Sequence, residues 1–377
     1  MKMSARFAIF YGAIFLTVGI YLPFWPAWLS FKGLDANEIS LLFSVGIWAR
    51  ALITPIMGHF ADHSGAHRKI IIITAGLSVI SYFLFIFAND FNSIFLLNLL
   101  ASTFFMSLIP LGENLASRAS AKHGFDYGRA RLWGSLTFIL AAYLGGFAIE
   151  KSSDSAILWL IILAIIVAFI ASLGLPQNTQ NRSSRVRFPA FTLLTNKTFM
   201  IFIMAVGLIQ SSHAVLYLFG TIHWRNADIP DHVIGGLWAE GVLAEIMLFA
   251  FSGRIIARIS PVTLMSVAAG AGIIRWSILG TTADVTILMA TQWLHGLTFG
   301  AAHLAAIHFM LRTVPDNMSA SAQSLYSGLA TGLIMGFVML IAGSLYSAIG
   351  GQAFYAMIPL SFTGGILVIY LFRLKNR

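Results

Sequence analysis

Twelve long apolar stretches recur along the chain, and they constrain its fold more than any other feature. The hydrocarbon core of a bilayer is about 30 Å thick, so an α-helix needs about 20 apolar residues to cross it. The sequence therefore predicts twelve membrane-spanning helices, which cover residues 7–29, 38–61, 70–89, 93–115, 129–149, 155–175, 198–223, 233–256, 261–280, 285–311, 320–347 and 351–372.

The composition indicates a chain that is surrounded mostly by lipid. Of its 377 residues, 58% are hydrophobic and 10% are charged, whereas a soluble domain carries about 25% charged residues. Stretches of this length favour helices over the strands of a β-barrel, which have about 10 residues of alternating polarity. The sequence contains no Cys, which excludes disulfides and thiolate metal sites. We expect an all-α membrane protein.

The 23 Lys and Arg residues are unevenly divided between the two sides that the predicted spans define. Eighteen fall on the side of the N-terminus, and only Lys32, Lys151 and Arg225 fall on the other. The remaining two, Arg50 and Arg275, lie inside predicted spans. Loops rich in Lys and Arg stay in the cytoplasm, so we expect both termini to be cytoplasmic, in a bacterial inner membrane. This distribution explains the net charge of +9 without a nucleic-acid partner.

The two halves of the chain resemble each other. Residues 46–66 align without gaps on residues 241–261, and a polar segment at 176–197 separates units of similar length, 1–175 and 198–377. We predict two pseudo-symmetric six-helix bundles joined by a cytoplasmic linker. The alignment places Arg50 opposite Glu245. Charged side chains inside a membrane are costly and often functional, and transporters built from repeats bind substrates between them.

A short loop between the second and third spans carries a motif. Residues 58–69 read GHFADHSGAHRK, in which Gly58 permits close helix packing and Gly65 a tight turn. Asp62 can accept hydrogen bonds from a helix N-terminus or from basic partners. The loop resembles the signature of the major facilitator superfamily, with His63 in place of the usual basic residue. The resemblance implies that Gly58, Asp62, Gly65 and Arg68 form a gating motif.

A second resemblance involves charged residues inside the spans. Glu113 is followed by the segment FDYGRAR, residues 125–131, which is similar to the lactose permease group of proton symporters. In that group the residues that match Glu113 and Arg131 bind substrate. Arg275 and His295 match an Arg and a His that the group uses in proton transfer. Thr298 departs from the pattern, because the group has its proton-carrying Glu there.

Five further segments resemble one branch of the superfamily, whose members are like phenylpropionate transporters. They are YLPFWPAWL, DYGRARLWGS, LWAEGVLAEI, RWSILG and LHGLTFGAAHLAA. The resemblance covers essentially the whole chain. It implies uptake of small molecules by proton symport, with aromatic acids as the leading substrate class.

The residues themselves leave alternatives open. Arg50 suits a substrate carboxylate, because a guanidinium binds it in a bidentate manner, or it forms an ion pair with Glu245 or another acid. Glu113 binds substrate or a proton, or it forms a structural ion pair with Arg131. Glu245 is a candidate proton carrier, since a changing environment can load and unload a carboxyl group. His295 can titrate near neutral pH or act only as a hydrogen-bonding residue.

We therefore predict a secondary transporter that imports a small organic solute by proton symport and alternating access. The expected solute is an aromatic monocarboxylate such as a phenylpropionate-like acid; the alternatives are a sugar or nucleoside symporter, which Glu113 and Arg131 favour, and an efflux transporter. No nucleotide-binding signature is present, so we expect neither an ATP-driven pump nor an enzyme. We expect no metal site and no cofactor besides the proton gradient, and a monomer. The predicted substrate-binding residues are Arg50, Glu113, Arg131, Trp25, Trp133 and Trp238, and the predicted proton-coupling residues are Glu245, Arg275 and His295.

Overall fold

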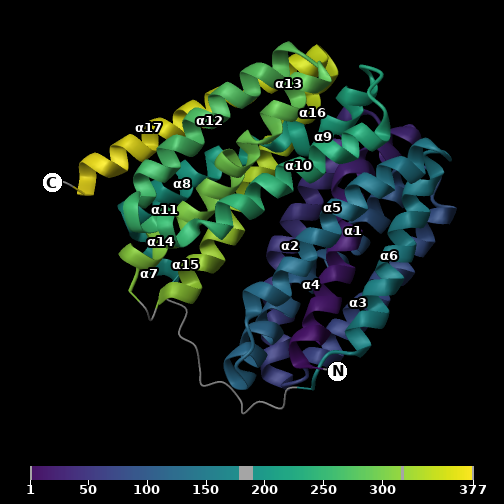
Figure 1. The fold of residues 1–377 in the computed structure, drawn as a ribbon, viewed down its shortest axis with the longest axis horizontal. Coiled ribbons are helices and arrows are strands. Elements are labelled where there is room, and N and C mark those ends of the chain that lie inside the picture. The colour runs from purple at the N-terminus through teal and green to yellow at the C-terminus, as the bar shows by residue number, and fades with distance from the viewer. Residues whose placement is uncertain (1, 178–189, 316–317, 376–377) are drawn as a thin grey trace. The chain divides into compact units, whose positions relative to one another are not determined.

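The computed structural model describes residues 2–177, 190–315 and 318–375. It does not describe the side chains of His59, Ala61, Asp62, His63, Ala190 and Lys375. All regular secondary structure in the described residues is helical (Figure 1). In the first half the helices are α1 (Met3–Phe31), α2 (Ala36–Ser64), α3 (His67–Leu84), η1 (Phe85–Phe87), α4 (Phe91–His123), α5 (Tyr127–Glu150) and α6 (Ser155–Leu173). In the second half they are α7 (Ala190–Thr195), α8 (Lys197–Ser211), α9 (Ala214–Arg225), α10 (Asp231–Ala250), α11 (Ser252–Arg258), α12 (Pro261–Thr281), α13 (Val285–Gln292), η2 (Gly296–Ala301), α14 (Ala302–Thr313), α15 (Ser319–Leu325), η4 (Tyr326–Ile334), α16 (Met335–Ile349), η5 (Gly350–Met357) and α17 (Ile358–Lys375).

Eleven helical runs among the described residues are long and apolar enough to cross a membrane, against the twelve spans predicted. The last run, Ser319–Leu374, has 56 residues, which extend about 84 Å as a helix, far more than one bilayer thickness. It contains two predicted spans, 320–347 and 351–372. Between them Gly350 adopts a φ of 55° and a ψ of −134°, a backbone conformation that is open to glycine. The twelve predicted spans therefore map onto eleven runs because α16 continues through this turn directly into η5 and α17.

Polar side chains mark where several helices begin. The side-chain oxygens of Asp90, Asp126, Asn196, Ser260 and Asp284 each accept a hydrogen bond from the backbone N–H three residues later. These bonds satisfy N–H groups that have no partner in the first helical turn. Short polar signals between apolar stretches thus set the ends of α4, α5, α8, α12 and α13.

Four predicted spans are interrupted in the structure, and in one of them, 320–347, the π-helical segment η4 lies between α15 and α16. The span at 198–223 breaks between α8 and α9 at Ser212 and His213. The span at 233–256 breaks at Phe251, between α10 and α11. The span at 285–311 contains the π-helical segment η2 between α13 and α14. Breaks of this kind are not visible in hydropathy, because the residues on both sides remain apolar.

The chain forms two compact units. Unit 1 comprises Met1–Leu34, Trp48–Val186 and Pro230–Ala239, and unit 2 comprises Asp35–Ile47, Arg187–Ile229 and Glu240–Arg377. The boundaries fall inside α2 and α10, so each of these helices contributes to both units. The predicted bundles, 1–175 and 198–377 with a linker at 176–197, remain a prediction; residues 178–189 of the linker lie outside the described residues.

Each unit is built from helices that pack along one another. In unit 1, α1 lies along α5 and α6, and α3 lies along α4 and α6 (Figure 1). In unit 2, α17 lies along α8 and α12, and α16 packs on α9 (Figure 1). Small residues permit this packing where helices approach closely, as helices in lipid associate mainly through such contacts.

Candidate functional site

Unit 2 contains a polar network at the middle of its helices. Arg275 on α12 is completely buried, and its Nη1 donates hydrogen bonds to Nδ1 of His295 at 2.8 Å and to Oγ1 of Thr298 at 3.0 Å. Its Nη2 donates to Oε1 of Gln292 at 2.8 Å. The other ring nitrogen of His295, Nε2, lies 2.8 Å from Oε1 of Glu245 on α10. The network therefore joins three of the residues predicted for proton coupling.

The partners of His295 determine which of its nitrogens carries the hydrogen. A guanidinium can only donate hydrogen bonds, so Nδ1 of His295 accepts from Arg275. The hydrogen of the neutral ring must then lie on Nε2, which donates it to the carboxylate of Glu245. An additional proton on Nδ1 would break the bond to Arg275. Arg275 and Glu245 balance each other in charge across a neutral imidazole, which is the condition under which charges are tolerated in an apolar interior.

A second histidine extends the network beyond the predicted residues. His213, which is fully buried, lies with Nδ1 3.0 Å from the backbone oxygen of Gln210 and Nε2 3.0 Å from Oγ1 of Thr298. The carbonyl oxygen can only accept, so Nδ1 carries the hydrogen and Nε2 of the neutral ring accepts from the Thr298 hydroxyl. Thr298, which replaces the Glu of the lactose permease group, thus accepts from Arg275 and donates to His213.

Local backbone features bring these side chains together. The break between α8 and α9 falls at His213, and η2, a π-helix, starts directly after His295 and includes Thr298. π-Helical turns inside α-helices are frequent at functional sites. Two glycines allow α10 to approach this segment: a Cβ on Gly296 would lie 2.8 Å from the backbone oxygen of Ala244, and one on Gly241 would lie 3.3 Å from the ring of His295.

In unit 1, Glu113 on α4 and Arg131 on α5 form an ion pair. Nε of Arg131 lies 3.7 Å from Oε1 of Glu113, and the two side chains are 28% and 42% exposed. The guanidinium of Arg131 lies over the ring of Phe15, 3.9 Å from its centroid, and 5.6 Å from that of Tyr11. This arrangement leaves both charged groups partly accessible above an aromatic surface.

Arg50, also in unit 1, is partly buried on α2 and lies within electrostatic range of Tyr21. Among the described residues of this unit, no carboxylate forms an ion pair with it. Arg50 and Glu245 occupy equivalent positions in their helices, counted from Ala36 and Asp231, as the sequence repeat requires. An Arg that lacks an acidic partner in its own unit is a suitable donor for a carboxylate ligand.

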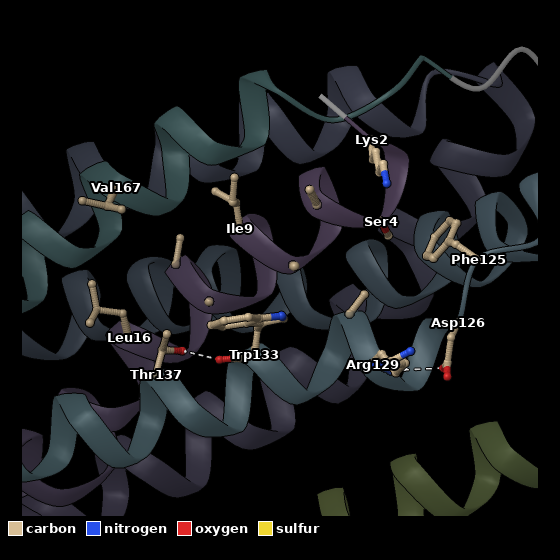
Figure 2. Close-up of a pocket in the computed structure, with 15 residues that line it drawn as sticks. Lys2, Ser4, Ile9, Leu16, Phe125, Asp126, Arg129, Trp133, Thr137 and Val167 are labelled. Carbon is tan, nitrogen blue, oxygen red and sulfur yellow. Dashed lines mark hydrogen bonds between the residues drawn. The ribbon is translucent and has the colours of Figure 1, made fainter.

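The three predicted tryptophans lie in different environments. Trp25 is completely buried; its ring stacks on Trp28 with centroids 4.6 Å apart, and its Nε1 donates to Oδ1 of Asn98 at 3.0 Å. Trp238 is 7% exposed in unit 1. Trp133 is 56% exposed and lines a pocket with Arg129 (Figure 2). It lies two residues after Arg131, which is about 200° around the helix, so these two side chains do not face the same site.

The gating motif is only partly described. Gly65 adopts a φ of 64°, the conformation that the expected tight turn requires. Nη2 of Arg68 donates to the backbone oxygen of Leu173 at 2.7 Å and so ties the start of α3 to the end of α6. A Cβ on Gly58 would meet no described atom within 4 Å, and the close helix packing expected at this glycine stays a prediction. The side chain of Asp62 lies outside the described residues.

Comparison with known proteins identifies the family to which this helical fold belongs. The model of the MFS_1 like family matches residues 4–357. The chain belongs to this family. Its members are transporters of the major facilitator superfamily, so the protein is a multi-pass membrane transporter and not an enzyme, as the sequence predicts.

Several relatives and structures are similar along the whole chain. The probable 3-phenylpropionic acid transporter of Escherichia coli (strain K12) is 29% identical, with 95% of each chain covered. The maltose permease of Geobacillus stearothermophilus is 25% identical, with 98% of this chain and 95% of the permease covered. The crystal structure of a point mutant of the nucleoside transporter NupG superposes with a TM-score of 0.90 at 17% identity, covering 98% of this chain and 100% of NupG. At that identity the likeness concerns the fold alone, and it agrees with the all-α fold that the sequence predicts.

Several residues of the unit 2 network were not predicted from the sequence. Gln292 binds Arg275, and His213 joins through Thr298. Gly241 and Gly296 control the approach of α10. His213 and Thr298 are 85 residues apart, and only the fold brings them into contact. The position of Gln292 could have been predicted from the sequence, because it lies one helical turn before His295 and so shares its helix face.

Proposed function

We propose that this transporter imports a small organic monocarboxylate together with a proton. The observation that carries the proposal is the 2.8 Å contact between Glu245 and a His295 ring whose other nitrogen is bound by Arg275. This arrangement leaves one place for an added proton, namely the carboxylate of Glu245. The similarity to a probable 3-phenylpropionic acid transporter supports an aromatic acid as the solute. We further propose, from the distribution of Lys and Arg, that both termini are cytoplasmic.

Charge balance couples the proton to the solute in this proposal. While Glu245 is ionised, it balances the buried charge of Arg275. When Glu245 takes up a proton, unit 2 gains a positive charge in a medium of low dielectric constant, which favours a bound anion. The same linkage requires that a bound anion favours the proton equally. Arg50, which has no carboxylate partner among the described residues of its unit, is the proposed ligand for the solute carboxylate.

A second candidate function is symport of a sugar or nucleoside. The observation in its favour is the Glu113–Arg131 pair, which is partly exposed above Phe15. A carboxylate and a guanidinium together can bind the hydroxyl groups of a neutral solute, because the pair offers both acceptors and donors. The similarity to the maltose permease supports this alternative.

The two functions are distinguished by uptake into proteoliposomes with an acidic exterior. The solutes are 3-phenylpropionate, its amide, maltose and a nucleoside, each labelled. We expect accumulation of the acid, abolished by a protonophore. Accumulation of maltose or the nucleoside without the acid would support the second candidate, and concentrative uptake that survives the protonophore would contradict proton coupling.

Substitution of Arg50 by Lys tests the carboxylate ligand. Lys retains the charge but loses the bidentate geometry, so we expect Arg50→Lys to weaken binding of the acid by about 1–3 kcal/mol and to change binding of the amide much less. Calorimetry with both ligands measures this difference, and Arg254→Lys, at an exposed position of α11, is the matched control. Equal losses of binding free energy for the acid and the amide would show that Arg50 has a structural role and does not bind the solute carboxylate.

A further inference from the structure

A pocket in unit 1 lies apart from the residues proposed to bind the solute. Its volume is about 820 Å³, and α1, the segment before α5, α5 itself and one residue of α6 line it (Figure 2). Glu113, Arg131 and Arg50 do not line it. Among the predicted substrate-binding residues only Trp133 does so, on the face of α5 opposite Arg131. The pocket is therefore a separate site on these helices, where Ile9, Trp133 and Val167 are exposed.

The lining changes in polarity along the helices. Lys2, Ser4 and Arg129 lie at one end, while Leu16, Thr137 and Val167 lie further along (Figure 2). The polar end coincides with the start of two membrane-spanning helices, because Lys2 directly precedes α1 and Asp126 is the N-cap of α5. From Lys2 to Leu16 the helix rises about 21 Å, which is close to the length of a phospholipid acyl chain. The deep part is apolar, since the Thr137 hydroxyl is occupied by the backbone oxygens of Trp133 and Gly134.

The charge at the polar end favours an anion. Lys2 and Arg129 are exposed, and neither forms an ion pair within the described part of the chain. Asp126 is the acidic residue of the lining, and its Oδ1 accepts a hydrogen bond from the backbone N–H of Arg129 at 3.1 Å. The rim therefore carries one net positive charge at the start of two membrane-spanning helices, where we expect a membrane to present its phosphate groups. Trp133, an amphipathic ring of the kind found at membrane interfaces, forms part of the wall.

We propose that this pocket binds an anionic phospholipid, with its phosphate between Lys2 and Arg129 and one acyl chain along the groove between α1 and α5. Basic pockets between membrane helices bind anionic lipid headgroups in this way. Two of the lining residues on α1, Ala5 and Ala8, have small side chains, which leave room for an acyl chain beside the helix.

Native mass spectrometry of the purified full-length transporter tests the proposal, with phosphatidylglycerol and phosphatidylcholine as the probes. We expect one phosphatidylglycerol to be retained in preference to phosphatidylcholine. Each basic residue near an anionic headgroup contributes about fivefold in affinity, so the double variant Lys2→Gln/Arg129→Gln should bind about 30-fold less phosphatidylglycerol. The matched control is Lys122→Gln/Lys197→Gln, which removes the same charge from exposed positions outside the pocket and should retain the lipid.

A second variant tests whether an acyl chain occupies the groove, without changing the charge of the pocket. Ala8→Phe places a ring in the groove and should lower retention of phosphatidylglycerol by a similar factor, with the thermal unfolding temperature used to confirm that the protein is folded. Retention by Ala8→Phe equal to that of the unchanged protein would mean that only a phosphate group is bound, and would overturn the proposal. So would equal retention of both lipids, or equal behaviour of the pocket and control double variants.

Discussion

At the scale of single residues, the partners of His295 are the most informative feature of the molecule. Arg275 can only donate and the carboxylate of Glu245 can only accept, so the imidazole between them has one permitted hydrogen position. A ring fixed in this way positions the carboxylate but cannot itself take up a proton without losing Arg275. In the proposed mechanism the residue that changes its charge is therefore Glu245, whereas the sequence left the choice open between Glu113 and Glu245.

Replacement of this carboxyl by an amide should separate proton movement from solute movement. Glu245→Gln retains an acceptor for His295 but cannot bind and release a proton. We expect accumulation driven by a pH gradient to be lost, while exchange of labelled for unlabelled solute continues. The matched control is Glu240→Gln, five residues earlier on α10, which should accumulate the solute normally. Normal accumulation by Glu245→Gln would show that the proton is carried elsewhere.

The hydroxyl of Thr298 should contribute measurably to stability. Thr298→Val is nearly isosteric but leaves His213 Nε2 and one Arg275 hydrogen bond without a partner in a buried region, which costs about 1–3 kcal/mol. Chemical denaturation in detergent measures the free energy of unfolding. Thr137→Val is the matched control, because its hydroxyl bonds to carbonyls of its own helix; its effect should stay within about 0.5 kcal/mol. Equal effects at the two sites would contradict the role of Thr298 in the network.

At the scale of helices, interruptions and close approaches determine where the network forms. α8 ends at Ser211 and α9 begins at Ala214, with His213 in the break between them, and η2 begins after His295. Discontinuous helices supply binding sites in many transporters, because they free backbone groups and direct side chains inward. The contact of Gly296 with Ala244 then sets the distance between Glu245 and His295.

A methyl group at Gly296 should disturb this contact. In Gly296→Ala the new Cβ would lie 2.8 Å from the backbone oxygen of Ala244, so α10 must move away from η2. We expect a loss of about 1–3 kcal/mol in stability and a marked fall in proton-driven uptake. Gly270→Ala on α12, where a Cβ meets no described atom within 4 Å, should be neutral or slightly stabilising. If both variants transported equally well, the close approach would have no functional importance.

The helices could be predicted from the sequence far better than the contacts between their side chains. Twenty apolar residues have few alternatives to a membrane helix, so every predicted span corresponds to observed helix. The resemblance to the lactose permease group also indicated a shared role in proton transfer for Arg275 and His295. The break at His213 and the π-helix η2 could not be predicted, because they depend on hydrogen bonds from other helices. The outward position of Trp133 could have been anticipated, since it lies two residues from Arg131 and a helix turns by about 100° per residue.

At the scale of the whole molecule, the ionisable groups are divided between the two units. Unit 1 holds Arg50 and the Glu113–Arg131 pair, and unit 2 holds the network of Glu245, His295 and Arg275. In the proposed mechanism the first set binds the solute and the second binds the proton. Such a division suits a transporter made of repeated halves, in which each half contributes its own residues.

If Glu245 is the one group that takes up a proton in each transport cycle, the net charge moved per cycle depends on the solute. A monocarboxylate that moves with one proton carries no net charge across the membrane, so its uptake should respond to a pH difference, at about tenfold accumulation per pH unit, and not to voltage. A neutral sugar that moves with one proton carries a positive charge, and its uptake should also gain about 2.3 kcal/mol from each 100 mV. Proteoliposomes clamped with valinomycin at chosen potassium gradients separate these two cases. Uptake of the acid that rises steeply with an inside-negative potential would require more than one proton per cycle, and therefore a second proton site besides Glu245.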